Sequence, residues 1–229
     1  MWPADPDSLI ALQDSLAATP MPGFTLDPAA SIGACYVCFA RGDTGAGAAG
    51  DPAWAAAALT RQGRRQSAAV VVPGESGAPY LPGLLALREG ALLEAAVRAL
   101  PYAPAVLLVD GTGRDHPRRA GLALHLGAAL GLPTVGVTHR PLLAAGDWPA
   151  PERGAASPLL LDGDLVGYWL RTRAGARPLA VHAAWGTDPG LAVEVVLAAT
   201  RRPRTPEPLR AARRAARRAR AAAEAGQRR

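Results

Sequence analysis

The chain has 229 residues, 49% of them hydrophobic, which is enough to bury one sizeable core in a single domain. No apolar run approaches the length of a membrane span, and the first residues lack the basic and apolar parts of a signal peptide. We therefore expect a cytoplasmic protein without a membrane partner. The net charge of +6 comes from an arginine- and alanine-rich tail, residues 201–229, because the body, residues 1–200, is net acidic; the charge therefore indicates nothing about a cleft in the body.

The first part of the chain predicts one helix followed by three strands. The helix is expected over residues 8–17, with Asp7 or Ser8 as its N-cap and an end before Pro20. Apolar and alanine-rich runs predict strands over residues 32–39, 54–60 and 67–72. A Gly-rich turn separates the first two, so the three strands can pair as an antiparallel meander.

Cys35 and Cys38 form a CxxC spacing inside the first of these strands. Successive side chains of a strand point to opposite faces, so residues three apart do not share a face. A metal pair or a redox motif would need a turn here, and the chain has no further cysteine. We therefore expect two buried free thiols.

The pattern of residues 105–137 is that of a buried strand, a turn, a helix and a second buried strand. Asp110 ends the first strand, at the edge of an α/β sheet where ligands gather. Pro117 suits the first position of the helix, which would place the basic stretch His116–Arg119 at a helix start that favours phosphate. A carboxylate opposite such a helix start predicts metal-assisted phosphate chemistry.

The segments on either side complete the predicted fold. A Pro/Gly loop over residues 74–83 holds Tyr80, and a helix carrying Glu89 is expected over residues 84–100. After the central unit come a loop and three strands, expected over residues 141–157, 158–161, 165–172 and 178–184. Asp188 and Pro189 begin a helix over residues 191–199, and the tail predicts a helix over residues 205–225. This order describes a mixed sheet flanked by helices, which is compatible with a ribonuclease H-like α/β arrangement and, on pattern alone, with other α/β folds.

Five stretches together resemble the endonuclease V family. They are PYLPGLLALREG (79–90), LLVDGTGRDHPRRAGLALHLG (107–127), LPTVGV (132–137), LRTRAGARPL (170–179) and TPEPLR (205–210). The resemblance implies a ribonuclease H-like fold and a nuclease, dependent on Mg²⁺ or Mn²⁺, with a role in nucleic-acid repair. It also implies cutting near deaminated bases such as hypoxanthine (inosine), in DNA and in some members RNA, by a monomer.

The resemblance also assigns roles to residues of this chain. It implies that Asp110 and Glu89 are the catalytic, metal-binding carboxylates. It implies that Tyr80, with Pro82, is a wedge that separates the strands at the lesion. For the pocket that takes the extruded base it implies Gly83, Leu85, Gly111 and Gly113. For contacts with the nucleic acid it implies His116, Arg118 and His139, the last standing where the family has a lysine.

Two further positions depart from the family pattern at the metal site. Tyr36 stands where the first strand of the family has an aspartate, and Trp185 stands where a later stretch has a histidine. Two-metal hydrolysis needs a carboxylate shared between ions about 4 Å apart, which a neutral tyrosine hydroxyl with a pKa near 10 does not supply. Four residues come near the altered positions, and each is more plainly a turn, capping or opposite-face residue: Asp43, Glu75, Asp188 and His182.

The sequence leaves several alternatives open. Asp110 could cap the turn that follows it, Glu89 could be an ordinary helix glutamate, and the tail arginines could be solvated rather than attract phosphate. The first functional hypothesis is a metal-dependent endonuclease of the endonuclease V type. The second is a non-catalytic or weakly active protein that binds deaminated bases in nucleic acid, which Tyr36 and Trp185 favour. The third is a single-metal hydrolase with a changed substrate.

Overall fold

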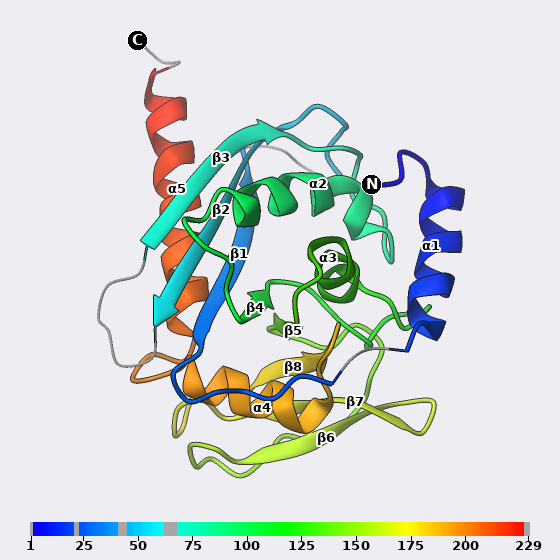
Figure 1. Ribbon diagram of the computed structural model, residues 1–229, viewed down its shortest axis with the longest axis vertical. Helices are drawn as coiled ribbons and strands as arrows, with labels where there is room; N and C mark the ends of the chain where they lie inside the picture. Colours follow the sequence, from blue (N-terminus) through cyan, green and yellow to red (C-terminus); the bar gives the residue numbers. More distant parts are fainter. Residues whose placement is uncertain (1, 21–22, 41–44, 62–67, 227–229) are drawn as a thin grey trace.

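The computed structural model describes residues 2–20, 23–40, 45–61 and 68–226, and an eight-stranded mixed sheet runs through them (Figure 1). The strands are β1 (Ser31–Phe39), β2 (Pro52–Arg61), β3 (Ala68–Glu75), β4 (Val106–Val109), β5 (Thr134–Thr138), β6 (Ala156–Leu161), β7 (Asp164–Leu170) and β8 (Leu179–Ala183). The helices are α1 (Pro6–Ala18), α2 (Leu85–Arg98), α3 (Leu122–Leu130), α4 (Pro189–Ala198) and α5 (Glu207–Gly226). The strand order is β3-β2-β1-β4-β5-β8-β7-β6, so the predicted mixed sheet flanked by helices is confirmed.

The two parallel pairs of the sheet lie at its centre. β4 runs parallel to β1 on one side and to β5 on the other, whereas all other neighbours are antiparallel. Parallel strands end at the same edge, and the pairing of Cys35 with Val109 brings the next residues, Tyr36 and Asp110, side by side at that edge. The topology therefore gathers these two residues at the position where open α/β sheets bind ligands.

Both faces of the sheet are covered, and the side chains of the central strands alternate between two cores. Cys35 and Leu107 belong to the core beneath α1, α2 and α3, whereas Ala34 and Leu108 belong to the core beneath α4. This explains why the strands are apolar at every position rather than at alternate ones. Cys35 and Cys38 are free and buried in different cores, which confirms the expectation of two unpaired thiols.

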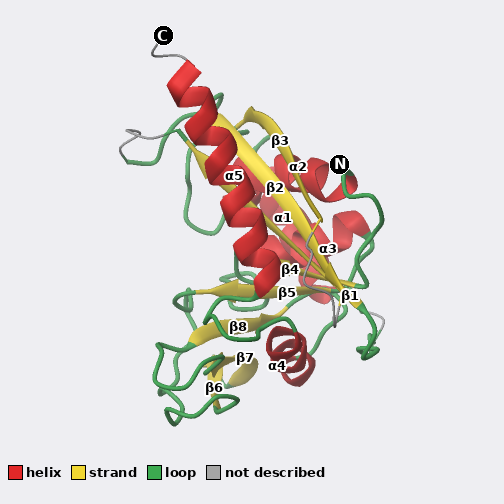
Figure 2. Cartoon of the chain, turned by 90° about the vertical axis from the view of Figure 1, so that its left-hand side faces the viewer, coloured by secondary structure: helices red, strands yellow, loops and turns green. Residues whose placement is uncertain are grey.

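Helix α5 lies along β1 and β2 on the face opposite α2 (Figure 2). Its contact surface consists of small side chains, Ala211, Ala212 and Ala216, which pack with Trp54 and Cys38. Alanine lets a helix approach a sheet closely, so the arginines that flank this stripe are held near the strands. The tail helix is thus a packed layer over this part of the sheet.

The central helix starts later than predicted. Residues 114–120 form a turn, and α3 begins at Leu122 with Gly121 as its N-cap, so Pro117 is not a first helical residue and the basic stretch His116–Arg119 does not open the helix. The physical reason is a tight turn closed by two backbone hydrogen bonds of 2.9 Å, from Gly121 to Gly113 and from Ala123 to Thr112. The prediction that the basic stretch lies at a helix start is therefore wrong.

The N-cap of α1 differs from the prediction, whereas the N-cap of α4 agrees with it. The Asp5 carboxylate accepts a hydrogen bond of 2.9 Å from the backbone nitrogen of Ser8, so Asp5 is the N-cap of α1, where Asp7 or Ser8 was expected. Asp188 caps α4 as predicted, with its carboxylate accepting from the nitrogen of Leu191 at 2.9 Å.

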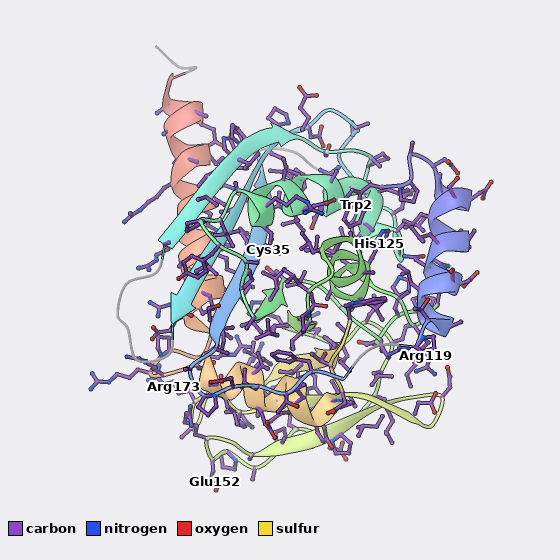
Figure 3. The ribbon with its side chains drawn as sticks, viewed as in Figure 1. Trp2, Cys35, Arg119, His125, Glu152 and Arg173 are labelled. Atoms are coloured by element: carbon purple, nitrogen blue, oxygen red, sulfur yellow. The ribbon has the colours of Figure 1, made fainter. Side chains whose placement is uncertain are left out.

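The start of the described chain is anchored to α2 and α3. The Trp2 ring stacks on His125 with ring centroids 4.2 Å apart, and its Nε1 donates to Glu94 at 2.5 Å (Figure 3). Burial lowers the pKa of His125 to about 4, which keeps the imidazole neutral in this stack. Across the residues described, we find no helix that combines the length and the apolar character needed to span a membrane.

Candidate functional site

Two cavities lie at the carboxyl edge of β1 and β4 and share Leu85 as a wall. The larger, about 460 Å³, is lined by residues of β1, α2 and α5 and by Asp110. The smaller, about 120 Å³, is lined by residues of α1, of the Pro/Gly loop before α2 and of the turn after β4. The site is thus assembled from segments that are far apart in the sequence.

The larger cavity holds the carboxylates that the sequence singles out. Asp110, Glu89 and Tyr36 line it together, as their expected common site requires. Burial, and after it the negative charge of Asp110, raise the pKa of Glu89 to about 8, whereas Arg88 acts in the opposite direction. Glu89 is therefore mostly protonated at neutral pH in the metal-free protein.

Arginines of α5 occupy the surroundings of Asp110. Arg213 Nη2 forms an ion pair of 2.9 Å with Asp110 Oδ2, and its guanidinium lies 5.5 Å from the centre of the Tyr36 ring. Arg217 Nη2 donates to the Tyr36 hydroxyl at 3.3 Å, and Arg220 Nη1 donates to the Phe39 carbonyl at 3.2 Å. The spacing of the three arginines, four and then three residues, places them on one face of the helix.

The sequence analysis left open whether the tail arginines are solvated or attract phosphate, and it did not single out these three. A signal was present in the sequence. Ala212, Ala216, Ala219 and Ala223 recur at helical spacing and pack against the sheet. Each of the three arginines comes one residue after a member of this stripe, so the packed face predicts which guanidiniums lie close to the strands.

The donor set does not fit a divalent metal centre. Mg²⁺ prefers oxygen ligands and usually needs ionised carboxylates. Here the Asp110 carboxylate is paired with Arg213, and the Tyr36 hydroxyl is hydrogen-bonded by Arg217, so both oxygen donors already have a cationic partner from the chain. Among the described residues, no group of three or more His, Cys, Asp or Glu side chains could hold a metal ion.

The smaller cavity brings together five of the expected recognition residues. They are Tyr80, Gly83, Leu85, Gly111 and His116. The rest of its wall comes from five residues that the sequence did not single out, namely Gln13, Ala86, Thr112, Leu122 and Leu142. Gln13 comes from α1, to which the sequence analysis assigned no functional role.

The carbonyl oxygen of Gly83 is the centre of a hydrogen-bond network beside this cavity. It accepts from Gln13 Nε2 at 3.2 Å, from His116 Nε2 at 3.0 Å and from Arg118 Nη2 at 3.1 Å. His116 Nδ1 accepts from the Arg118 backbone nitrogen, so Nε2 carries the imidazole proton. Gly83 has a φ of 74°, which favours glycine at this position.

This network changes the interpretation of two residues that were expected to contact the nucleic-acid backbone. His116 is 3% exposed, and burial, the largest cause, lowers its pKa. Arg118 donates its Nε to Gln13 at 2.7 Å in addition to its bond with Gly83. In the structure both side chains therefore hold the loop around Gly83 in place, and they face the cavity wall rather than open solvent.

Asp115 supports the opposite wall, and sequence reasoning gave it no role. The carboxylate is fully buried and accepts hydrogen bonds from the backbone nitrogens of Leu142, Leu143 and Ala144 at 2.6, 2.8 and 2.8 Å. His182 Nδ1 lies 3.7 Å from it, and burial lowers the pKa of His182 to about 4. Asp115 thus positions Leu142 at the cavity.

Arg88, the neighbour of Glu89, anchors the two loops in front of α2. It is 6% exposed, pairs with Asp51 at 3.0 Å, and donates to the Ala78 carbonyl at 2.7 Å. Its guanidinium also lies 4.1 Å from the centre of the Phe39 ring. The loop that carries Tyr80 is therefore fixed to the helix that carries Glu89.

The structure does not bring Trp185 to the Asp110 cavity. β8 is antiparallel to β5 and pairs Ala183 with Val135, so the residues after β8 lie at the amino end of β5, away from Asp110. The backbone of Trp185 bonds there with Thr134, and its side chain packs in the core beneath α3. Trp185, the second altered position, therefore lines neither of the two cavities.

The remaining expected residues take other positions. Gly113 packs against β8, where an added Cβ would come within 2.0 Å of the Ala183 carbonyl oxygen, so it serves close packing and does not line the cavity. His139 is exposed beyond β5, and burial followed by Arg204 and Arg213 lowers its pKa, while Asp110 raises it. Pro82 is exposed, and Asp43 lies outside the described residues.

The model of the family described as Endonuclease V matches residues 32–214 of this chain. The endonuclease V of Thermus thermophilus is 40% identical over 214 residues, covering 92% of this chain and 91% of the relative. The chain belongs to the endonuclease V family. The endonuclease V of Streptomyces avermitilis is 45% identical over an alignment that spans 61% of each chain.

Solved structures of the endonuclease V family share the fold. The crystal structure of the Streptomyces avermitilis protein superposes with a TM-score of 0.86 at 36% identity, covering 97% of this chain and 96% of that one. A Ciona intestinalis endonuclease V was solved in complex with a 24-mer DNA containing an inosine followed by a ribo-adenosine. It superposes with a TM-score of 0.78 at 19% identity, covering 93% of this chain and 96% of that one. The predicted ribonuclease H-like arrangement is confirmed.

Proposed function

We propose that this endonuclease V family member binds nucleic acid that contains a deaminated base and takes the base into the smaller cavity. The observation that carries the proposal is the convergence of Tyr80, Gly83, Leu85, Gly111 and His116 on one cavity of about 120 Å³. Pockets for drug-sized ligands are roughly 300–1,000 Å³, so this cavity suits a single ring system rather than a whole nucleotide. The inosine-containing DNA in the Ciona intestinalis complex supports the same class of ligand.

Tyr80 is suited to open the strand beside this cavity. Its side chain is 46% exposed, and its backbone nitrogen donates to the Ala46 carbonyl at 2.7 Å. Pro79 and Pro82 stiffen the loop on either side. An exposed aromatic ring on a fixed loop can stack in place of a base that leaves the helix, which offsets part of the unstacking free energy.

Phosphodiester hydrolysis is the second candidate, and the meeting of Asp110 and Glu89 in the larger cavity favours it. It would require Mg²⁺ or Mn²⁺ at a donor set that does not fit a divalent ion. A nick in an inosine-containing duplex that requires either metal, and that is lost in Asp110→Asn, would establish hydrolysis. Binding without a nick supports the first proposal.

The test of base recognition compares duplexes that differ in one base. Fluorescence anisotropy with an inosine-containing duplex and its adenine counterpart is expected to show preferential binding of inosine. Tyr80→Ala should weaken inosine binding about tenfold, since stacking on an aromatic side chain contributes about 1–3 kcal/mol per base. Tyr102→Ala is the matched control, because Tyr102 is equally exposed, at 51%, but does not line the cavity.

Equal affinities of the wild-type protein for the two duplexes would contradict the proposal. An equal loss of affinity in Tyr80→Ala and Tyr102→Ala would contradict the role of Tyr80 as the wedge. The same titration with an inosine-containing RNA strand determines whether DNA or RNA is preferred.

A further inference from the structure

We propose that the guanidinium groups of α5 take the place of a metal ion in this protein: Arg213, with Arg217 and Arg220, binds a backbone phosphate of the nucleic acid at the Asp110 cavity, so that binding needs no divalent cation. The inference rests on the proposed function only in that the ligand is a nucleic acid. It does not depend on which base the smaller cavity prefers.

The position of the guanidinium at Asp110 is the first support. Arg213 Nη2 is 2.9 Å from Asp110 Oδ2, the carboxylate at the carboxyl end of β4. The neighbouring position, where the family pattern has an aspartate, holds Tyr36 in this chain. The centre of the Tyr36 ring lies 5.5 Å from the guanidinium carbon of Arg213 and 5.7 Å from that of Arg217. A cation supplied by the chain therefore already neutralises Asp110.

Unsatisfied donors are the second support. An arginine carries five N–H donors, and a buried donor without an acceptor is unfavourable. Within the described chain, the Nε atoms of Arg213 and Arg220 are buried and have no hydrogen-bond acceptor, although Arg220 Nε lies 3.6 Å from Glu224. Arg220 also lines the larger cavity. A phosphate supplies acceptor oxygens in the geometry that a planar guanidinium binds best, once the two side chains turn so that these Nε atoms face the cavity.

The packing of α5 makes this arrangement rigid. Ala211, Ala212 and Ala216 hold the helix on β1 and β2, so the backbone that carries the three arginines is in place before any ligand arrives (Figure 2). The two cavities share Leu85. A nucleotide whose base enters the smaller cavity therefore brings an adjacent phosphate to the larger one.

The test measures affinity for the inosine-containing duplex by anisotropy across a salt series, in EDTA and in Mg²⁺. Wild-type protein is expected to bind equally in both. Arg213→Gln should bind about tenfold more weakly and reduce the slope of log K against log salt by about 1, as expected for the loss of one phosphate contact. Arg213→Lys should restore the slope but not the full affinity, because it keeps the charge and loses the fork of donors.

Arg218→Gln is the matched control, because Arg218 lies on the same helix, is exposed and does not line the larger cavity. It should change the affinity less than twofold. Thermal unfolding of each variant checks that it is folded. A titration of the wild-type protein alone with Mn²⁺ should detect no bound metal. Equal effects of Arg213→Gln and Arg218→Gln, Mn²⁺ binding by the free protein, or wild-type binding that EDTA abolishes would each overturn the proposal.

The adenine duplex separates this inference from the proposed function. The strength of a phosphate contact does not depend on the base, so Arg213→Gln should weaken binding of the inosine and adenine duplexes by the same factor. If wild-type protein does not distinguish the duplexes but Arg213→Gln weakens both, base recognition fails and the phosphate site stands. If inosine is preferred but Arg213→Gln has no effect, the phosphate site fails.

Discussion

Asp115→Ala is expected to destabilise the protein by about 3–5 kcal/mol, the range for breaking a buried charged network. The reason is that three backbone nitrogens, those of Leu142, Leu143 and Ala144, lose their acceptor in an environment from which water is excluded. Urea unfolding measures the change. Because Leu142 lines the smaller cavity, the same variant should also bind the inosine-containing duplex more weakly.

A second variant at position 115 and a control variant at another aspartate test the reason for this loss. Asp115→Asn should fall between wild type and Asp115→Ala, because the amide keeps one acceptor oxygen but turns its NH₂ group toward backbone donors. Asp14→Ala, at an exposed position of α1, should be close to neutral. A loss below about 1 kcal/mol in Asp115→Ala would show that the segment 142–144 finds other acceptors and that Asp115 does not hold it.

Glu89→Gln is expected to stabilise the protein increasingly as the pH rises from about 4.5 to about 8. The folded protein raises the pKa of Glu89 to about 8 from an ordinary value of 4.5, through burial first and the Asp110 charge second. Below pH 4.5 the carboxyl is protonated in both states. Above it only the unfolded state loses the proton, so wild-type stability falls by up to about 1.4 kcal/mol per pH unit.

Urea unfolding of wild type and Glu89→Gln at pH 5, 6.5 and 8 measures this difference. Glutamine is neutral and of the same size, so the variant should lack this pH dependence. Glu152→Gln, at an exposed loop position (Figure 3), controls for the substitution itself. Identical pH profiles for wild type and Glu89→Gln would mean that Glu89 is ionised in the folded protein, and a second carboxylate would then be available to a metal.

The sequence by itself determined the fold and five of the residues that line the smaller cavity. Hydrophobic periodicity and Gly/Pro turns are local signals, and they placed β1 and β4, the α4 start at Asp188 and the burial of both cysteines. Family motifs named Tyr80 and Gly83, which the structure brings to one cavity. These features depend on short stretches of chain whose conformation their own residues specify.

Only the tertiary structure decided what surrounds Asp110. Arg213 is 103 residues away in the sequence, and the alanine stripe of the tail indicates its packed face but not which part of the sheet that face covers. Likewise, the antiparallel direction of β8 carried Trp185 away from the site, and the turn at 114–120 moved the basic stretch off the helix start. The physical reason is that contacts between distant elements depend on strand direction and on the position of one packed layer over another, which no local pattern of residues specifies.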